Sequence, residues 1–157
     1  MLYNLRNRGE LLPENKPDIL LIEDNRYNVE FMLEALEKLN LADSVKIFKD
    51  GEKALDYLFA AGEYLGRDSC KRPRVILLDL RLPKIGGLEV LRRIKSNEMT
   101  RMIPVVVFTS SAKDEDREES YKLGANSYIV KPNSYENFVK TVAEIVSYWA
   151  LQNEPYC

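Results

Sequence analysis

A short run of branched apolar residues ending in an acid limits the folds open to this chain more than any other feature. Residues 75–78 read Val-Ile-Leu-Leu, and Asp79 follows directly. Continuous Val, Ile and Leu without alternation indicate a strand buried on both faces, as in a parallel sheet covered by helices on both sides. Such sheets carry their chemistry at the carboxyl ends of the strands, so Asp79 is a candidate functional residue. A strand-end acid on its own also fits a turn or a helix cap.

The same alternation of a short apolar run and a helical pattern recurs along the chain. The other expected strands are 18–22, 44–49, 103–111 and 127–130, and the expected helices begin at Asn25 and after Gly51, Gly87, Lys113 and Ser134. Five strands alternating with five helices predict parallel βαβ units with right-handed crossovers. We therefore expect a single α/β domain with a doubly wound, five-stranded parallel sheet of flavodoxin-like strand order 2-1-3-4-5.

The length of 157 residues suits one hydrophobic core. We place the domain at residues 17–152, between a flexible leader at 1–16 and a C-terminal tail at 153–157. The leader mixes charges of both signs and lacks the apolar core of a signal peptide. No run approaches the length of a membrane span.

The composition narrows the partners and the chemistry. Lys and Arg number 23 against 25 Asp and Glu, which gives no reason to expect nucleic acid or a membrane surface as the main partner. The two cysteines, Cys70 and Cys157, have no metal-like spacing, and this favours a reducing cytoplasm. The chain has no His, which removes His-based metal sites and Ser-His or Cys-His nucleophiles.

The expected strand order brings three acids together at the switch point between the first and third strands. Glu23 and Asp24 follow the first strand, and Asp79 follows the third. Three adjacent carboxylates repel one another unless protons are taken up or a cation lies among them. Oxygen-only ligation without His or paired Cys favours a hard ion, and Mg²⁺ suits a site with few carboxylates.

A hydroxyl and a lysine complete the predicted pocket. Thr109 ends the fourth strand and Lys131 ends the fifth. A metal, the Lys131 charge and the Thr109 hydroxyl together suit a phosphoryl group, which the Asp79 carboxylate could attack in line. The product would be a reactive aspartyl phosphate, which suits a timed switch.

This set of residues resembles the receiver domain of two-component response regulators. Glu23-Asp24, Asp79, Thr109 and Lys131-Pro132 each lie at the end of an expected strand, and the intervals of 30 residues from Asp79 to Thr109 and 22 from Thr109 to Lys131 are similar to that family's. The resemblance covers Pro17 to about Tyr148. It implies a phosphoacceptor signalling domain that catalyses its own phosphorylation and dephosphorylation and is not otherwise an enzyme.

The resemblance also implies roles at the metal site. Asp79 would be the phosphoacceptor, Asp24 and Asp79 direct Mg²⁺ ligands, Glu23 a ligand through water, and the backbone carbonyl of Arg81 a further ligand.

The remaining implied roles concern switching and lifetime. Thr109 would move toward the phosphoryl group while Tyr128 turns inward, and Arg81 with Ser111 would tune dephosphorylation. Pro132 would have a structural role, with a cis bond after Lys131.

Two further features narrow the resemblance to stand-alone regulators paired with bacterial phytochromes. These are the insertion between Glu63 and Arg74 and the sequence Ser147-Tyr148-Trp149 near the end of the last helix. The implied partner is a sensor histidine kinase, a phytochrome among the candidates, or a phosphotransfer protein. Output would pass through protein contacts, and a homodimer through the face of the fourth helix, fifth strand and fifth helix is one expectation.

Other protein classes fit these residues less well. A flavin-binding domain needs a phosphate loop where this chain has Glu23-Asp24, and a haloacid-dehalogenase phosphatase needs a second Asp at position 81, which is Arg81. The remaining alternative is a phosphorylation-independent interaction module with a vestigial site. The acidic run at 114–119 is interpreted as a solvated helix face.

Overall fold

The computed structural model describes residues 19–156, and in them five strands alternate with five α-helices. The elements are β1 (Ile19–Ile22), α2 (Arg26–Lys38), β2 (Val45–Phe48), α3 (Gly51–Leu58), β3 (Val75–Leu78), α4 (Gly87–Ser96), β4 (Val105–Thr109), α5 (Asp114–Lys122), β5 (Ser127–Val130) and α6 (Tyr135–Val146). Short 3-10 turns lie at Ala42–Ser44 and Gly62–Tyr64, and a π-helical segment, Ser147–Gln152, continues α6.

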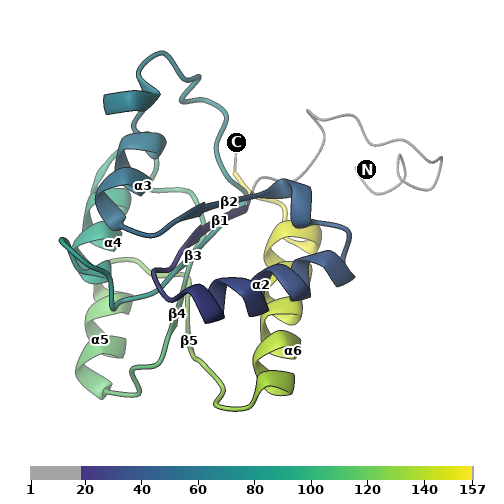
Figure 1. Ribbon diagram of the computed structural model, residues 1–157. Coiled ribbons are helices and arrows are strands. Elements are labelled where there is room, and N and C mark those ends of the chain that lie inside the picture. Colours follow the sequence, from purple (N-terminus) through teal and green to yellow (C-terminus); the bar gives the residue numbers. More distant parts are fainter. Residues whose placement is uncertain (1–18, 157) are drawn as a thin grey trace.

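The five strands form one parallel sheet in the order β2-β1-β3-β4-β5. Helices α2 and α6 cover one face, and α3, α4 and α5 cover the other (Figure 1). This confirms the predicted doubly wound, flavodoxin-like fold and its strand order.

The central strands are buried because both sheet faces are covered. Every residue of β1, β3 and β4 is buried, whereas the edge strands β2 and β5 are half-buried. Successive side chains alternate between the two cores: Leu20 and Ile22 pack with α3 and α4, and Ile19 and Leu21 pack with α2 and α6. The unbroken apolar run at residues 75–78 is therefore a strand buried on both faces of the sheet, as the sequence predicted.

Local signals set the helix ends. Asn25 caps α2 by accepting bonds from the amides of Tyr27 and Asn28, at 3.0 and 3.1 Å. Gly124 follows α5 with φ +104°, a left-handed conformation that favours glycine. The start of α2 lies where the sequence predicted it.

Three expectations change in detail. The fourth strand is shorter than 103–111, since Pro104 before it has no amide hydrogen for the ladder. The sequence pattern predicts a last helix from about Ser134 to Leu151, but the α-helix ends at Val146 and continues as the π-helical segment. The expected cis bond after Lys131 is wrong, because no described residue has a cis peptide bond. Trans remains the lower-energy form of an X–Pro bond by about 0.5–1 kcal/mol.

The proposed leader at 1–16 and the first residues of the predicted domain lie outside the described residues, and the tail is described only to Tyr156. The tail begins against the body of the domain, because Arg74 Nη2 donates to the carbonyl of Asn153 at 2.7 Å. Among residues 19–156, no helix is both long and apolar enough to cross a membrane.

Candidate functional site

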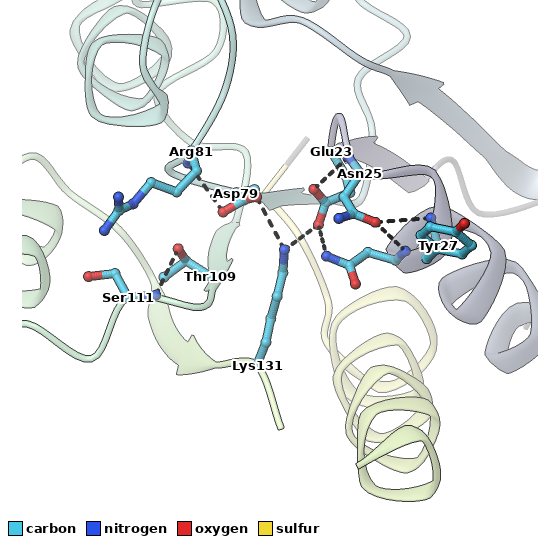
Figure 2. A network of polar contacts seen from close by, with 9 residues as sticks. Glu23, Asn25, Tyr27, Asp79, Arg81, Thr109, Ser111 and Lys131 are labelled. Atoms are coloured by element: carbon cyan, nitrogen blue, oxygen red, sulfur yellow. Dashed lines mark hydrogen bonds and ion pairs between the residues drawn. The ribbon is translucent and has the colours of Figure 1, made fainter. Parts of the chain in front are cut away.

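The carboxyl ends of four neighbouring strands deliver the predicted site residues to one edge of the sheet. Glu23 follows β1, Asp79 follows β3, Thr109 ends β4 and Lys131 follows β5 (Figure 2). The parallel register aligns these ends, since Ile22 is the partner of Leu78. The fold thus assembles residues separated by as many as 108 positions in the chain.

Three carboxylates gather at this edge. One oxygen each of Glu23, Asp24 and Asp79 lies within 4.8 Å of the others. Glu23 is 1% exposed and Asp79 is 6% exposed, whereas Asp24 is exposed to solvent. The cluster is therefore buried on the sheet side and open to water on the Asp24 side.

Lys131 lies between two of the carboxylates. Its Nζ forms an ion pair with Glu23 and lies 3.2 Å from Oδ2 of Asp79 (Figure 2). The ammonium offsets the mutual repulsion of the two acids at a place where little water screens it.

Glu23 is also held by α2. The Asn28 side-chain amide donates to its Oε1 at 3.2 Å, and the Asn25 amide donates to its Oε2 at 3.3 Å. Burial raises the pKa of Glu23 above its ordinary value, and the adjacent Lys131 charge offsets part of this effect. The carboxyl group has little freedom to move.

The loop after Asp79 closes tightly on that residue. The amide of Arg81 donates to Oδ1 of Asp79 at 3.2 Å, and the Gly87 amide donates to the carbonyl of Leu80 at 2.9 Å. A Cβ placed on Gly87 would lie 2.3 Å from the carbonyl oxygen of Asp79. Only glycine fits this close backbone approach.

The hydroxyl groups of Thr109 and Tyr128 are linked through the backbone of Ser111. Thr109 is fully buried, and its Oγ1 accepts a bond from the Ser111 amide at 3.3 Å. The Tyr128 hydroxyl donates to the Ser111 carbonyl at 2.9 Å, and burial raises the pKa of Tyr128. Tyr128 packs at the edge of the core formed with α3 and α4.

The structure therefore brings Glu23, Asp24, Asp79 and Lys131 together, and links Thr109 to Tyr128 through Ser111. The Arg81 side chain points to solvent, and only its amide contacts Asp79.

Sequence reasoning missed two contacts at this edge. The sequence pattern does not predict the contact of Asn28 with Glu23, although a spacing of three residues from the Asn25 cap places Asn28 on the same side of α2. Asp116 belongs to the run at 114–119 that the sequence predicts to be solvated, but it is partly buried and accepts a hydrogen bond from the Ser111 hydroxyl. No sequence signal distinguishes Asp116 from its exposed neighbours.

The donor set fits a hard divalent cation. Carboxylate oxygens from Glu23, Asp24 and Asp79 converge, and this cluster contains no nitrogen or sulfur ligand. Mg²⁺ is commonly bound by one or two carboxylates while it keeps several waters, which suits the open side at Asp24.

The chain is similar in sequence to response regulators. The sequence pattern of the response regulator receiver domain matches residues 19–143. The chain is 44% identical over 149 residues to the probable methanogenesis regulatory protein FilR2 of Methanothrix harundinacea, covering 95% of this chain and 94% of that one.

Two solved structures are similar in fold and sequence. The phosphorylated cyanobacterial phytochrome response regulator RcpA matches with a TM-score of 0.83 and 36% identity, over 90% of this chain and 99% of that one. The Mn²⁺-bound form of response regulator Rcp1 matches with a TM-score of 0.81 and 35% identity, with the same coverage.

Proposed function

The chain belongs to the response regulator receiver domain family, and on that premise we propose that Asp79 accepts a phosphoryl group from a sensor histidine kinase. The observation that carries the proposal is the buried Asp79 carboxylate, paired with Lys131 and grouped with two further acids. Metal-assisted phosphoryl transfer to a carboxylate needs these parts in this arrangement.

The transfer is a displacement at phosphorus. An Asp79 carboxylate oxygen forms the new O–P bond while the N–P bond to the kinase histidine breaks, and the electron pair leaves with the nitrogen. Lys131, already 3.2 Å from Asp79 Oδ2, and the Thr109 hydroxyl donate to the phosphoryl oxygens.

The acids supply the metal ligands. Asp24 and Asp79 would bind Mg²⁺ directly, Glu23 would bind it through water, and the backbone carbonyl of Arg81 would be a further ligand. A bound Mg²⁺ neutralises charge on the phosphoryl oxygens. The similar regulator Rcp1 has been solved in a Mn²⁺-bound form, which supports a divalent ion as the cofactor of this chain.

Switching runs through Thr109 and Tyr128. Thr109 moves toward the phosphoryl group, and Tyr128 responds through the Ser111 segment that both residues contact. Arg81 and Ser111 tune hydrolysis, since the Arg81 amide contacts Asp79 and the Ser111 amide contacts Thr109. The phosphoryl group is lost when water attacks phosphorus and the bond to the Asp79 oxygen breaks, which releases phosphate.

The partner is proposed from the relatives. RcpA is a phytochrome response regulator, which favours a phytochrome kinase as the phosphodonor of this chain. A phosphotransfer protein is the alternative donor. We place the chain and its donor in the cytoplasm. The chain is also similar to a probable methanogenesis regulatory protein, so a kinase other than a phytochrome is an outcome to test. Output passes to a protein, and the α5–β5–α6 face, with Tyr121 and Val130 exposed, is the proposed homodimer surface.

Intact mass measurement tests the phosphoacceptor. Wild-type protein is incubated with acetyl phosphate and Mg²⁺, beside Asp79→Ala, a sample with EDTA, and Asp114→Ala as a matched control on an exposed acid. We expect one phosphoryl group on the wild type and on Asp114→Ala, and none on Asp79→Ala or without metal.

A wild type that gains no mass, either with acetyl phosphate or with a phosphorylated histidine kinase, contradicts the proposal. The chain would then be the phosphorylation-independent interaction module. A gain on Asp79→Ala equal to that of the wild type would place the acceptor elsewhere.

A further inference from the structure

Asp116 differs from the other acids at the start of α5. The first turn carries Asp114, Glu115 and Asp116, and the first two are exposed whereas Asp116 is partly buried. Its Oδ2 accepts a hydrogen bond from the Ser111 hydroxyl, and Ser111 is 4% exposed. A buried hydroxyl that donates to a carboxylate makes one of the stronger hydrogen bonds in proteins.

Ser111 is the residue through which the switch residues are linked. Its amide donates to Thr109 Oγ1 at 3.3 Å, its carbonyl accepts from Tyr128 at 2.9 Å, and its hydroxyl donates to Asp116. The position of Ser111 therefore decides whether the contacts to Thr109 and Tyr128 exist together.

Asp116 is itself fixed within α5. The hydroxyl of Ser120, which is fully buried, donates to the Asp116 carbonyl at 2.7 Å. The Lys113 amide lies 3.4 Å from the Ser111 hydroxyl oxygen, so the turn entering the helix closes on the same atom. Helix α5 thus holds the β4–α5 loop from its own first turn.

We propose that Asp116 is a positioning residue that latches the β4–α5 loop through Ser111 and prolongs the phosphorylated state. The inference rests on the proposed function of Asp79. Without the latch, Ser111 is free to leave Thr109 and Tyr128, and water gains access to the buried Thr109 side of the site. Hydrolysis of the aspartyl phosphate then becomes faster.

The test measures, in the wild type and in three variants, how fast the phosphoryl group is lost from the protein after the phosphodonor is removed. We expect Asp116→Ala to shorten the lifetime about two- to tenfold, which is less than a fully buried bond to a carboxylate would provide because Asp116 is only partly buried. Asp116→Asn, which keeps a side-chain oxygen as acceptor, restores most of the lifetime. Asp114→Ala removes a charge from the same helix turn and leaves the lifetime unchanged.

A double-mutant cycle addresses the contact itself. Ser111→Ala in the Asp116→Ala background should add little to the effect of Asp116→Ala on the lifetime, because both substitutions remove the same hydrogen bond. Fully additive effects, or a lifetime that falls equally in Asp114→Ala, overturn the latch.

Hydrogen exchange separates this inference from the proposed function. In unphosphorylated protein the Ser111 amide should exchange faster in Asp116→Ala than in the wild type or Asp114→Ala. If the Ser111 amide exchanges faster in Asp116→Ala but the wild type gains no phosphoryl group, the contact between Asp116 and Ser111 is upheld. The proposal that Asp79 is the phosphoacceptor is then rejected. Equal exchange and equal lifetimes in phosphorylated protein overturn the latch alone.

Discussion

The ammonium nitrogen of Lys131 lies 3.2 Å from Oδ2 of Asp79, although 52 residues separate the two in the chain. On its other side the same nitrogen forms an ion pair with Glu23. One cation therefore balances two nearly inaccessible carboxylates, and this balance makes the site sensitive to changes at Lys131.

Lys131→Met should lower the free energy of unfolding in EDTA by about 3 kcal/mol, since it leaves buried carboxylates without a counter-charge. Mg²⁺ should restore more stability to the variant than it adds to the wild type, because it supplies the missing positive charge. Thermal unfolding with and without Mg²⁺ measures both effects. Lys140→Met, at an exposed position on α6, is the control, and equal Mg²⁺ responses in all three proteins would contradict the assigned role.

Gly87→Ala should destabilise the fold by about 2 kcal/mol or more and reduce labelling of Asp79, because the new Cβ would overlap the backbone of Asp79 and Leu80. Gly86→Ala is the matched control, since the nearest atom to its Cβ is 3.9 Å away and its φ is −71°. Chemical denaturation and intact mass measure the two effects. If both variants behaved alike, the close approach at Gly87 would not constrain the loop.

Because of Lys95, the free energy of unfolding should rise between about pH 8 and pH 10.4. Its Nζ donates to the carbonyls of Arg101 and Ile103 and to the Asn126 side chain, and burial lowers the pKa of Lys95 to about 8. The unfolded chain keeps its proton to about pH 10.4. Between these values the folded state has lost a proton that the unfolded state retains, so folding becomes more favourable as the pH rises.

The expected gain from pH 8 to 10.5 is about 1–3 kcal/mol relative to Lys95→Met, which has no titrating group at this position. Denaturant unfolding of both proteins at several pH values gives the difference. A parallel pH dependence of the two proteins would show that burial does not shift this amine.

Arg67→Ala should loosen the insertion between α3 and β3 without affecting labelling of Asp79. The Arg67 guanidinium lies 3.9 Å from the Tyr57 ring centroid and donates to the carbonyls of Tyr57 and Lys71. Loss of these contacts should cost about 1–2 kcal/mol. Limited proteolysis should cut the variant faster within residues 65–74, whereas Lys71→Ala, which keeps the accepting carbonyl, should be cut like the wild type.

The sequence by itself determined the sheet and the set of acids at its edge. The apolar runs at residues 19–22 and 75–78 reveal strands buried on both faces, because only such strands dispense with alternating polar residues. Alternation with helices then leaves few parallel topologies, and these bring Glu23, Asp24 and Asp79 to one edge. Each of these inferences uses local patterns and general rules of chain connection.

Only the tertiary structure decided which polar atoms meet. It placed Lys131 between two acids, joined Asn28 to Glu23, and withdrew Asp116 from a run of exposed acids. It also showed a trans bond before Pro132. These outcomes depend on side-chain direction and on distances of a few ångströms between segments remote in sequence, which periodicity does not encode.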